Sequence, residues 1–302
     1  MILDSGDLLF KKYKNPISEN EKHVEIEKAD LMVKSFNLMG LDVLSIGDDD
    51  LSLGKGFLLE ISKKTNFPII ASNIFDEETD KPIFMPYLLK EINGIKIGIF
   101  GLISEHLFSS PDNSRKKGIK IVPPLEIATK IVEELRPKTD LIILLSHLSY
   151  PKDIELIQTV KGINFIFGSH LGMNLSSPPI INNTVILQSA PKGMYGAMVD
   201  LTIYNNQPVF YNLSTKREME RRLHLIQQRL NQTQIREEEK TQLIKAKNEY
   251  DKTLRGFSGK NEFAVFITTL HDQIKEDPEI KKLIEDYKAK ISIHKGTNPQ
   301  KN

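Results

Sequence analysis

The sequence contains no cysteine, and this absence excludes several kinds of chemistry at once. A chain without thiols forms no disulfide, offers no thiolate ligand to a metal and has no cysteine nucleophile. The absence is compatible with a reducing or an oxidising compartment. Any metal site in this protein must therefore use other side chains.

The sequence also lacks an excess of charge and any long apolar run. Its 302 residues include 41 Lys and Arg against 40 Asp and Glu, which gives a formal net charge of +1. This balance creates no global field that attracts nucleic acid or acidic lipid, so we expect no nucleic-acid partner. No run of about 18 apolar residues is present, so we predict no transmembrane segment. The N-terminus lacks the basic and apolar regions of a secretory signal.

The first part of the chain, residues 1–213, repeats short apolar runs that each end in a polar or glycine-bearing loop. Most runs do not alternate with polar residues, which is typical of strands buried on both faces. Residues 24–39 and 124–135 show helical spacing between such runs. We therefore predict an α/β layered sheet, whose ligands bind at the loops after the strands' carboxyl ends. The runs are residues 1–3, 42–46, 68–72, 95–102, 140–146, 163–169, 184–190 and 197–204.

The segment 214–302 has a different composition and forms the second predicted domain, a helical extension. It opens with a stretch rich in Glu, Lys, Arg and Gln that contains neither proline nor glycine. Apolar residues spaced by three and four form a narrow seam there, which is typical of paired helices and coiled coils. We predict an antiparallel helical hairpin, either a solvated arm without chemistry or a surface for self-association. The seam residues are Met219, Leu223, Ile226, Leu230, Leu243, Tyr250 and Leu254.

Four polar side chains follow apolar runs directly: Asp7, Asp48, His147 and His170. Because the carboxyl ends of parallel strands meet at one edge of a sheet, we expect these groups to converge. Two carboxylates and two imidazoles suit a divalent metal such as Mn, Zn or Fe.

Each of these residues also has a simpler interpretation. A single histidine after a strand is often structural, and Asp7 belongs to a Ser-Gly-Asp sequence that favours a turn. The acidic run 48–50 could be a solvated loop or the N-cap of the segment that begins at Leu51. The shared position of all four residues at strand ends favours the metal site.

The order of these motifs resembles the 5′-nucleotidase branch of the calcineurin-like metallophosphoesterases. The motifs are DSGD, GDDD, ASN at 71–73, LLSHL, FGSH and QSAPKGMYGAMVDL, within residues 1–215. The resemblance implies a metallophosphoesterase-type β-sandwich flanked by helices, a divalent metal and a small phosphorylated, nucleotide-like substrate. It also implies nucleotide catabolism and a periplasmic or exported location, whereas a chain complete as given would stay in the cytoplasm.

The resemblance assigns one complete set of metal ligands. Asp7 matches the carboxylate that bridges two metals in the family. Asp48 stands where the family has an asparagine ligand of the second metal, and aspartate can serve there. His147 and His170 match the two histidines of that metal.

The ligands of the first metal are largely missing, and so is the family's catalytic histidine. The DxH motif that precedes the GD motif is absent, and Gly172 replaces a further histidine. A start upstream of Met1, which opens an expected interior strand, would supply DxH and an export signal. Asp49 stands at the position of the catalytic histidine, where a carboxylate repels phosphate unless it is protonated or metal-bound.

Two functions follow from this sequence. The first is a metal-dependent phosphoester hydrolase, whose activity could be reduced by the missing groups. The second is a non-catalytic protein of the same fold that binds partners through its helical arm.

Overall fold

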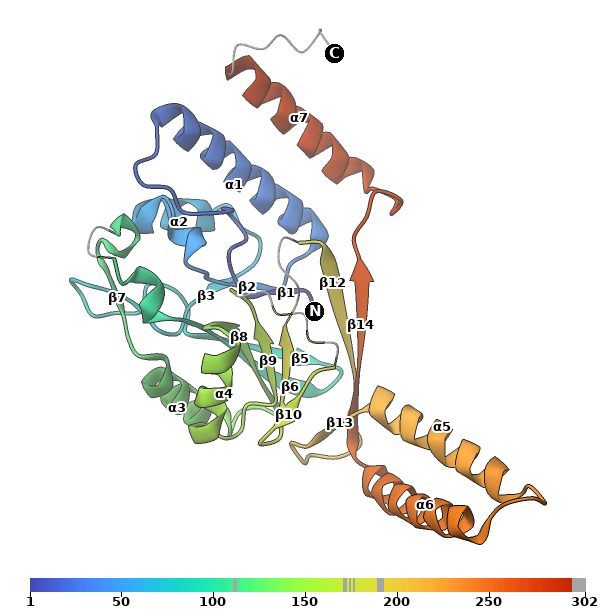
Figure 1. The fold of residues 1–302 in the computed structure, drawn as a ribbon. Helices are drawn as coiled ribbons and strands as arrows, with labels where there is room; N and C mark the ends of the chain where they lie inside the picture. Colours follow the sequence, from blue (N-terminus) through green and yellow to red (C-terminus); the bar gives the residue numbers. More distant parts are fainter. Residues whose placement is uncertain (111–112, 171–172, 174, 176, 189–192, 295–302) are drawn as a thin grey trace. The chain divides into compact units, whose positions relative to one another are not determined.

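The computed structural model describes residues 1–294 except 111–112, 171–172, 174, 176 and 189–192 (Figure 1). Its contacts form two units, one of Met1–Tyr195 with the segment from Leu270 onward, and one of Gly196–Thr269. Residue 213, the expected domain boundary, lies inside the second unit. The division into a domain of residues 1–213 and a helical extension of residues 214–302 stays a prediction. None of the described helices is long and apolar enough to cross a membrane.

The larger sheet of the first unit has six strands in the order β10-β11-β9-β8-β6-β5. The four inner strands are parallel, and the two edge strands run antiparallel to their neighbours. Every residue of β8 is buried, which explains why its sequence does not alternate with polar residues. The strands are β5 (Tyr87–Ile92), β6 (Ile95–Ile103), β8 (Leu141–His147), β9 (Phe165–Gly168), β10 (Ile180–Ile181) and β11 (Thr184–Gln188).

A smaller parallel sheet packs against the larger one. It consists of β1 (Leu3–Asp4), β2 (Val43–Ser45) and β3 (Ile69–Ile70). The two sheets approach closely at Gly101 of β6, where an added Cβ would lie 2.2 Å from Ser45 Oγ. Only glycine permits this approach, and the predicted β-sandwich is confirmed. The strands β4 (Ile74–Asp76) and β7 (Ile119–Ile121) form a separate antiparallel pair.

Helices cover the outer faces of the two sheets (Figure 1). The helices α1 (Glu19–Met39) and α2 (Gly54–Ser62) pack against the smaller sheet through one apolar cluster. The helices α3 (Pro124–Leu135) and α4 (Tyr150–Thr159) pack against the larger sheet through a second cluster. The first unit therefore has four layers, which are helices, sheet, sheet and helices.

Capping residues define the ends of the first helix, and the last helix packs beside it. The side chain of Ser18 accepts a hydrogen bond from the backbone N–H of Glu21 and starts α1, and Gly40 ends that helix in the left-handed region with φ 72°. The last helix, α7 (Pro278–His294), lies beside α1, and Lys290 pairs with Glu27 at 2.9 Å. Short 3₁₀ turns complete the unit: η1 (Asp49–Leu51), η2 (Glu105–Phe108) and η3 (Ser114–Lys116).

The second unit contains the helical hairpin. Its helices α5 (Leu213–Leu230) and α6 (Glu237–Phe257) pack together, and all the predicted seam residues are half-buried. The predicted hairpin is therefore confirmed. We expected the segment after residue 214 to be helical throughout, but it also contains a strand. This strand, β14 (Asn261–Thr269), pairs with β13 (Phe210–Asn212) and β12 (Tyr195–Thr202). Aromatic and β-branched residues give β14 its strand character.

Candidate metal centre

The loops after β1 and β2 touch each other at two glycines. A Cβ on Gly6 would lie 2.4 Å from the backbone N of Gly47, and Gly6 has φ 103°. A Cβ on Gly47 would lie 2.3 Å from Asp7 Oδ1. Neither position has room for a side chain, and this close approach brings Asp7 next to the loop that carries Asp48.

The structure brings together all four residues that the sequence singles out. Asp7, Asp48, His147 and His170 each offer one ligand atom, and these atoms lie within 4.8 Å of one another. His147 Nε2 lies 3.2 Å from Asp7 Oδ2 and 3.1 Å from Asp48 Oδ1. His170 Nδ1 lies 3.7 Å from the same oxygen of Asp48. The two imidazoles come from the ends of β8 and β9, as expected for a parallel sheet.

Each carboxylate uses one oxygen for a protein donor and directs the other at His147. Asp7 Oδ1 accepts a hydrogen bond from the backbone N–H of Asp49 at 2.8 Å. Asp48 Oδ2 accepts one from Arg115 Nη1 at 2.5 Å. Such outer partners orient metal ligands in proteins. The cluster therefore offers two fixed carboxylate oxygens and two imidazole nitrogens, a donor set that fits a divalent cation.

The ring of His147 is fully buried, and a backbone carbonyl faces its Nδ1. Its Nδ1 lies 3.1 Å from the backbone carbonyl oxygen of Ser5, which can only accept, so Nδ1 carries a hydrogen. Burial lowers the pKa of His147, but hydrogen bonds to Asp48 and Asp7 outweigh it and raise the pKa to about 10. A cation bound among these groups must therefore displace the proton on Nε2.

The pKa of Asp48 responds to the same neighbours. Burial disfavours its charged form, but the hydrogen bonds and positive charges of His147 and Arg115 hold its pKa below the usual value. Asp48 is thus an ionised carboxylate, which is the form that binds metals.

The three adjacent aspartates do not form a solvated loop as one interpretation expected, because Asp48 and Asp50 are buried. Asp48 is the residue before η1, but its side chain makes no capping hydrogen bond. Asp50 is fully buried and accepts the backbone N–H groups of Asp7, Leu9 and Gly47 at 2.8–2.9 Å. Burial and the charge of Asp7 raise the pKa of Asp50 to about 7, against the opposing effect of these donors.

Asp49 lies between the other two and is partly buried. Its Oδ1 accepts the backbone N–H of Tyr13 at 2.8 Å and Arg115 Nη1 at 3.3 Å. Burial and the charge of Asp7 raise the pKa of Asp49. The three aspartates are therefore held in different ways: Asp48 and Asp49 share Arg115, whereas Asp50 accepts backbone N–H groups alone.

Comparisons with known proteins point to one family, although no protein-family model matches the chain. A 5′-nucleotidase of Vibrio cholerae is 28% identical over 222 residues, which are 63% of this chain and 40% of that protein. The trifunctional nucleotide phosphoesterase protein YfkN of Bacillus subtilis is 26% identical over 235 residues, 65% of this chain and 15% of that protein. The crystal structure of calcineurin-like phosphoesterase YfkN from Bacillus subtilis covers 97% of this chain and 84% of that chain, with a TM-score of 0.63 and 14% identity.

The chain therefore resembles the 5′-nucleotidase-like, calcineurin-like metallophosphoesterases in sequence and in fold. It spans less than half the length of the Vibrio cholerae 5′-nucleotidase and of the curated YfkN protein. The family implies a divalent metal, and the four-residue cluster is the candidate site for it.

Two of the candidate ligands have unusual backbones. Asp7 has φ 62° and His170 has φ 76°, both in the left-handed region that residues with side chains seldom adopt. Such conformations cost about 1–3 kcal/mol and concentrate at functional sites. No pattern in the sequence reveals them.

Arg115 is the main site residue that the sequence does not reveal. It lies in η3 within a run of basic residues that reads as a solvated surface. Its side chain is nevertheless only 8% exposed and contacts both Asp48 and Asp49. Gly172, which replaces a family ligand, lies outside the described residues.

Asn73 of the ASN motif connects neighbouring segments of the backbone. It is fully buried, and its Nδ2 donates to the carbonyl oxygens of Ile103 and Val122 at 2.8 and 3.0 Å. Its Oδ1 accepts the backbone N–H of Ile103 at 3.1 Å. The amide thereby joins β6 to the loops beside it.

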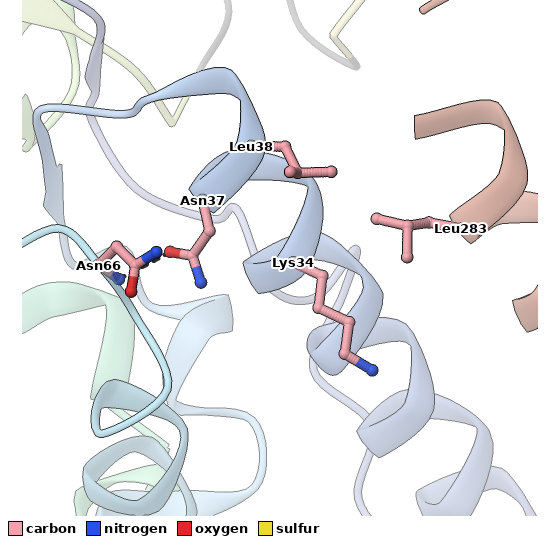
Figure 2. Close-up of a pocket in the computed structure, with 5 residues that line it drawn as sticks. All are labelled: Lys34, Asn37, Leu38, Asn66 and Leu283. Carbon is pink, nitrogen blue, oxygen red and sulfur yellow. Dashed lines mark hydrogen bonds between the residues drawn. The ribbon is translucent and has the colours of Figure 1, made fainter. Parts of the chain in front are cut away.

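A separate pocket lies between α1 and α7 and contains none of the candidate ligands (Figure 2). Its lining offers one charged side chain, two amides and two leucines, without a carboxylate or an imidazole. The lining residues are Lys34, Asn37, Leu38, Asn66 and Leu283. This pocket therefore lacks the groups for metal-dependent hydrolysis.

Proposed function

We propose that this metallophosphoesterase is a metal-dependent hydrolase of small phosphoesters, with a nucleotide-like substrate. The observation that carries the proposal is the convergence of four ligand atoms, from Asp7, Asp48, His147 and His170, within 4.8 Å. The relatives support it, since their names are those of a 5′-nucleotidase and a nucleotide phosphoesterase.

A divalent cation at this site would polarise a phosphoryl oxygen and lower the pKa of a bound water. The protein's part is to fix the ligands before the substrate arrives. The Ser5 carbonyl sets the tautomer of His147, and the Asp49 N–H and Arg115 set the rotations of Asp7 and Asp48. Mn, Zn and Fe all accept this donor set, and we propose one ion of this group.

Asp49 is our candidate for the group that holds a proton during the reaction. A general acid must stay protonated at the working pH, and the raised pKa of Asp49 moves it in that direction. The alternative of a solvated loop does not hold for Asp49, because its side chain is only 17% exposed. An Asp49→Asn variant should retain metal binding and lose turnover.

Hydrolysis assays test the proposed activity directly. Purified protein supplied with Mn²⁺ or Zn²⁺ should hydrolyse nitrophenyl phosphate and nucleoside monophosphates. The matched control is Asp7→Asn, which preserves shape and removes one ligand charge. Turnover no greater than that of the control would refute the proposal.

A second candidate is a non-catalytic protein that works through its helical arm. The specific observation is that Leu225 of α5 and Ile244 of α6 are 48% and 43% exposed, so the hairpin presents apolar side chains to solvent. Self-association through this hairpin should be lost in a Leu225→Lys, Ile244→Lys variant, as measured by light scattering. A monomeric wild-type protein would contradict it.

An exported location stays a prediction from the family, which cell fractionation would test.

A further inference from the structure

Arg115 is fixed firmly against the candidate metal centre. Its Nη1 donates to Asp48 Oδ2 at 2.5 Å and to Asp49 Oδ1 at 3.3 Å. Its Nε donates to Asn113 Oδ1 at 3.0 Å, and its Nη2 donates to the backbone carbonyl of Leu107 at 3.2 Å. All three nitrogens of the guanidinium therefore have acceptors within the protein.

The guanidinium is also shielded from water by aromatic rings. Its carbon lies 4.4 Å from the ring centre of Tyr13 and 5.1 Å from that of Phe108. The side chain is 8% exposed. Since little water screens a charge in such a place, Arg115 acts strongly on the carboxylates and on any cation beside them.

Arg115 leaves Asp48 with one oxygen for a metal ion, Oδ1, which faces His147. Among the described residues one group offers three or more metal-ligand side chains, and the guanidinium already binds the second oxygen of Asp48. Another divalent ion at that oxygen would meet a fixed positive charge.

We propose that Arg115 stands in for a second cation and makes this a centre for a single metal ion. The guanidinium fixes Asp48 with Oδ1 toward His147, and its Nη1 also contacts Asp49 Oδ1. Arg115 is thus a positioning residue, because its nitrogens bond to protein groups. This inference rests on the metal-dependent function proposed above.

Manganese binding tests the inference without any assay of activity. We expect calorimetry to give one Mn²⁺ per chain for the wild-type protein, and paramagnetic resonance to give the six-line spectrum of an isolated ion. In Arg115→Met, Asp48 and Asp49 lose their shared cation, so a second Mn²⁺ should bind and couple magnetically to the first.

Two further variants separate charge from geometry. Arg115→Lys keeps the charge but loses the planar fork, so it should still bind one ion, about tenfold more weakly. The control Arg136→Met removes an arginine whose Nη2 donates to the Lys161 carbonyl at 2.6 Å. It should bind one ion with wild-type affinity.

Several results would overturn the role of Arg115. The first is that the wild-type protein binds no ion, or binds two ions with similar affinity. The second is that the Arg115→Met variant matches the wild type in stoichiometry and spectrum. If Arg115→Met does not fold, the number of ions bound by the wild type and by Arg115→Lys still tests the role of Arg115. One bound ion without phosphoester turnover would refute only the proposed function, and turnover with two bound ions would refute only the inference.

Discussion

Asp50 Oδ1 accepts a hydrogen bond from the backbone N–H of Leu9 at 2.8 Å, in the buried interior of the first unit. The other oxygen of Asp50 accepts the N–H groups of Asp7 and Gly47 at 2.8 and 2.9 Å. One carboxylate therefore joins the loop after β1 to the loop after β2. It supports both halves of the metal centre without being placed among its ligands.

This relationship predicts the effect of Asp50→Asn. An amide has one acceptor oxygen, and its NH₂ group would face backbone N–H donors, so at least one buried donor loses its partner. We expect a loss of about 3 kcal/mol in the free energy of unfolding. Urea titration followed by circular dichroism would measure it, and Mn²⁺ affinity should fall as well. A stability equal to that of the wild type would show that Asp50 does not join the loops.

Gly47 predicts a steric effect at the same place. In Gly47→Ala the new Cβ would lie 2.3 Å from Asp7 Oδ1 and 2.8 Å from His147 Cε1, so these ligands must move. We expect a loss of about 1–3 kcal/mol in stability and a large drop in metal affinity. The matched control is Gly56→Ala in α2, where the added Cβ meets nothing within 4 Å beyond its own turn of helix. It should gain about 0.5–1 kcal/mol and bind metal normally.

Ser169 predicts an indirect effect on metal affinity. Its Oγ lies 2.8 Å from His147 Nδ1 and supports the ring together with the Ser5 carbonyl. Removing the hydroxyl in Ser169→Ala should weaken Mn²⁺ binding about tenfold, because partners of a ligating histidine tune its orientation and basicity. Ser62→Ala in α2, whose Oγ donates to the Leu59 carbonyl at 2.8 Å, serves as the control. Equal affinities in both variants would contradict the prediction.

The ion pair of Lys55 and Asp76 predicts a dependence of stability on pH. Lys55 Nζ lies 2.7 Å from Asp76 Oδ2, and hydrogen bonds from Lys55 and Thr79 hold the pKa of Asp76 below its usual value. A lowered pKa in the folded state adds stability above the unfolded pKa of about 4, and this stability is lost as the pH falls. The wild type should exceed Asp76→Asn in stability at pH 6, and the difference should narrow below about pH 4. Urea titrations at several pH values would test this, and a constant difference would refute it.

The sequence predicts the regular parts of this fold well. Helix α3 has the bounds that the apolar spacing and the opening proline indicate, Pro124–Leu135. The hairpin seam and the buried parallel strands also follow from periodicity, because the buried face repeats with the geometry of the element. The convergence of the four strand-end residues follows from the topology of parallel sheets.

The remaining features depend on contacts that no local pattern encodes. The burial of Asp50 depends on the loop after β1, which lies far away in the sequence. Arg115 reads as a surface charge until Tyr13 and Phe108 are placed around it. The left-handed conformations of Asp7 and His170 are uncommon for any residue with a side chain, and the surrounding structure must hold them in place.

The pairing of α1 with α7 places a constraint on biosynthesis. The first unit draws on both ends of the described chain, because the segment from Leu270 returns to it and Lys290 binds Glu27. On the ribosome both sheets and α1 can assemble early, because α1 packs on the smaller sheet, whereas α7 can join α1 only after it leaves the exit tunnel. The emergence of α7, rather than that of the sheets, is therefore the event that completes the unit.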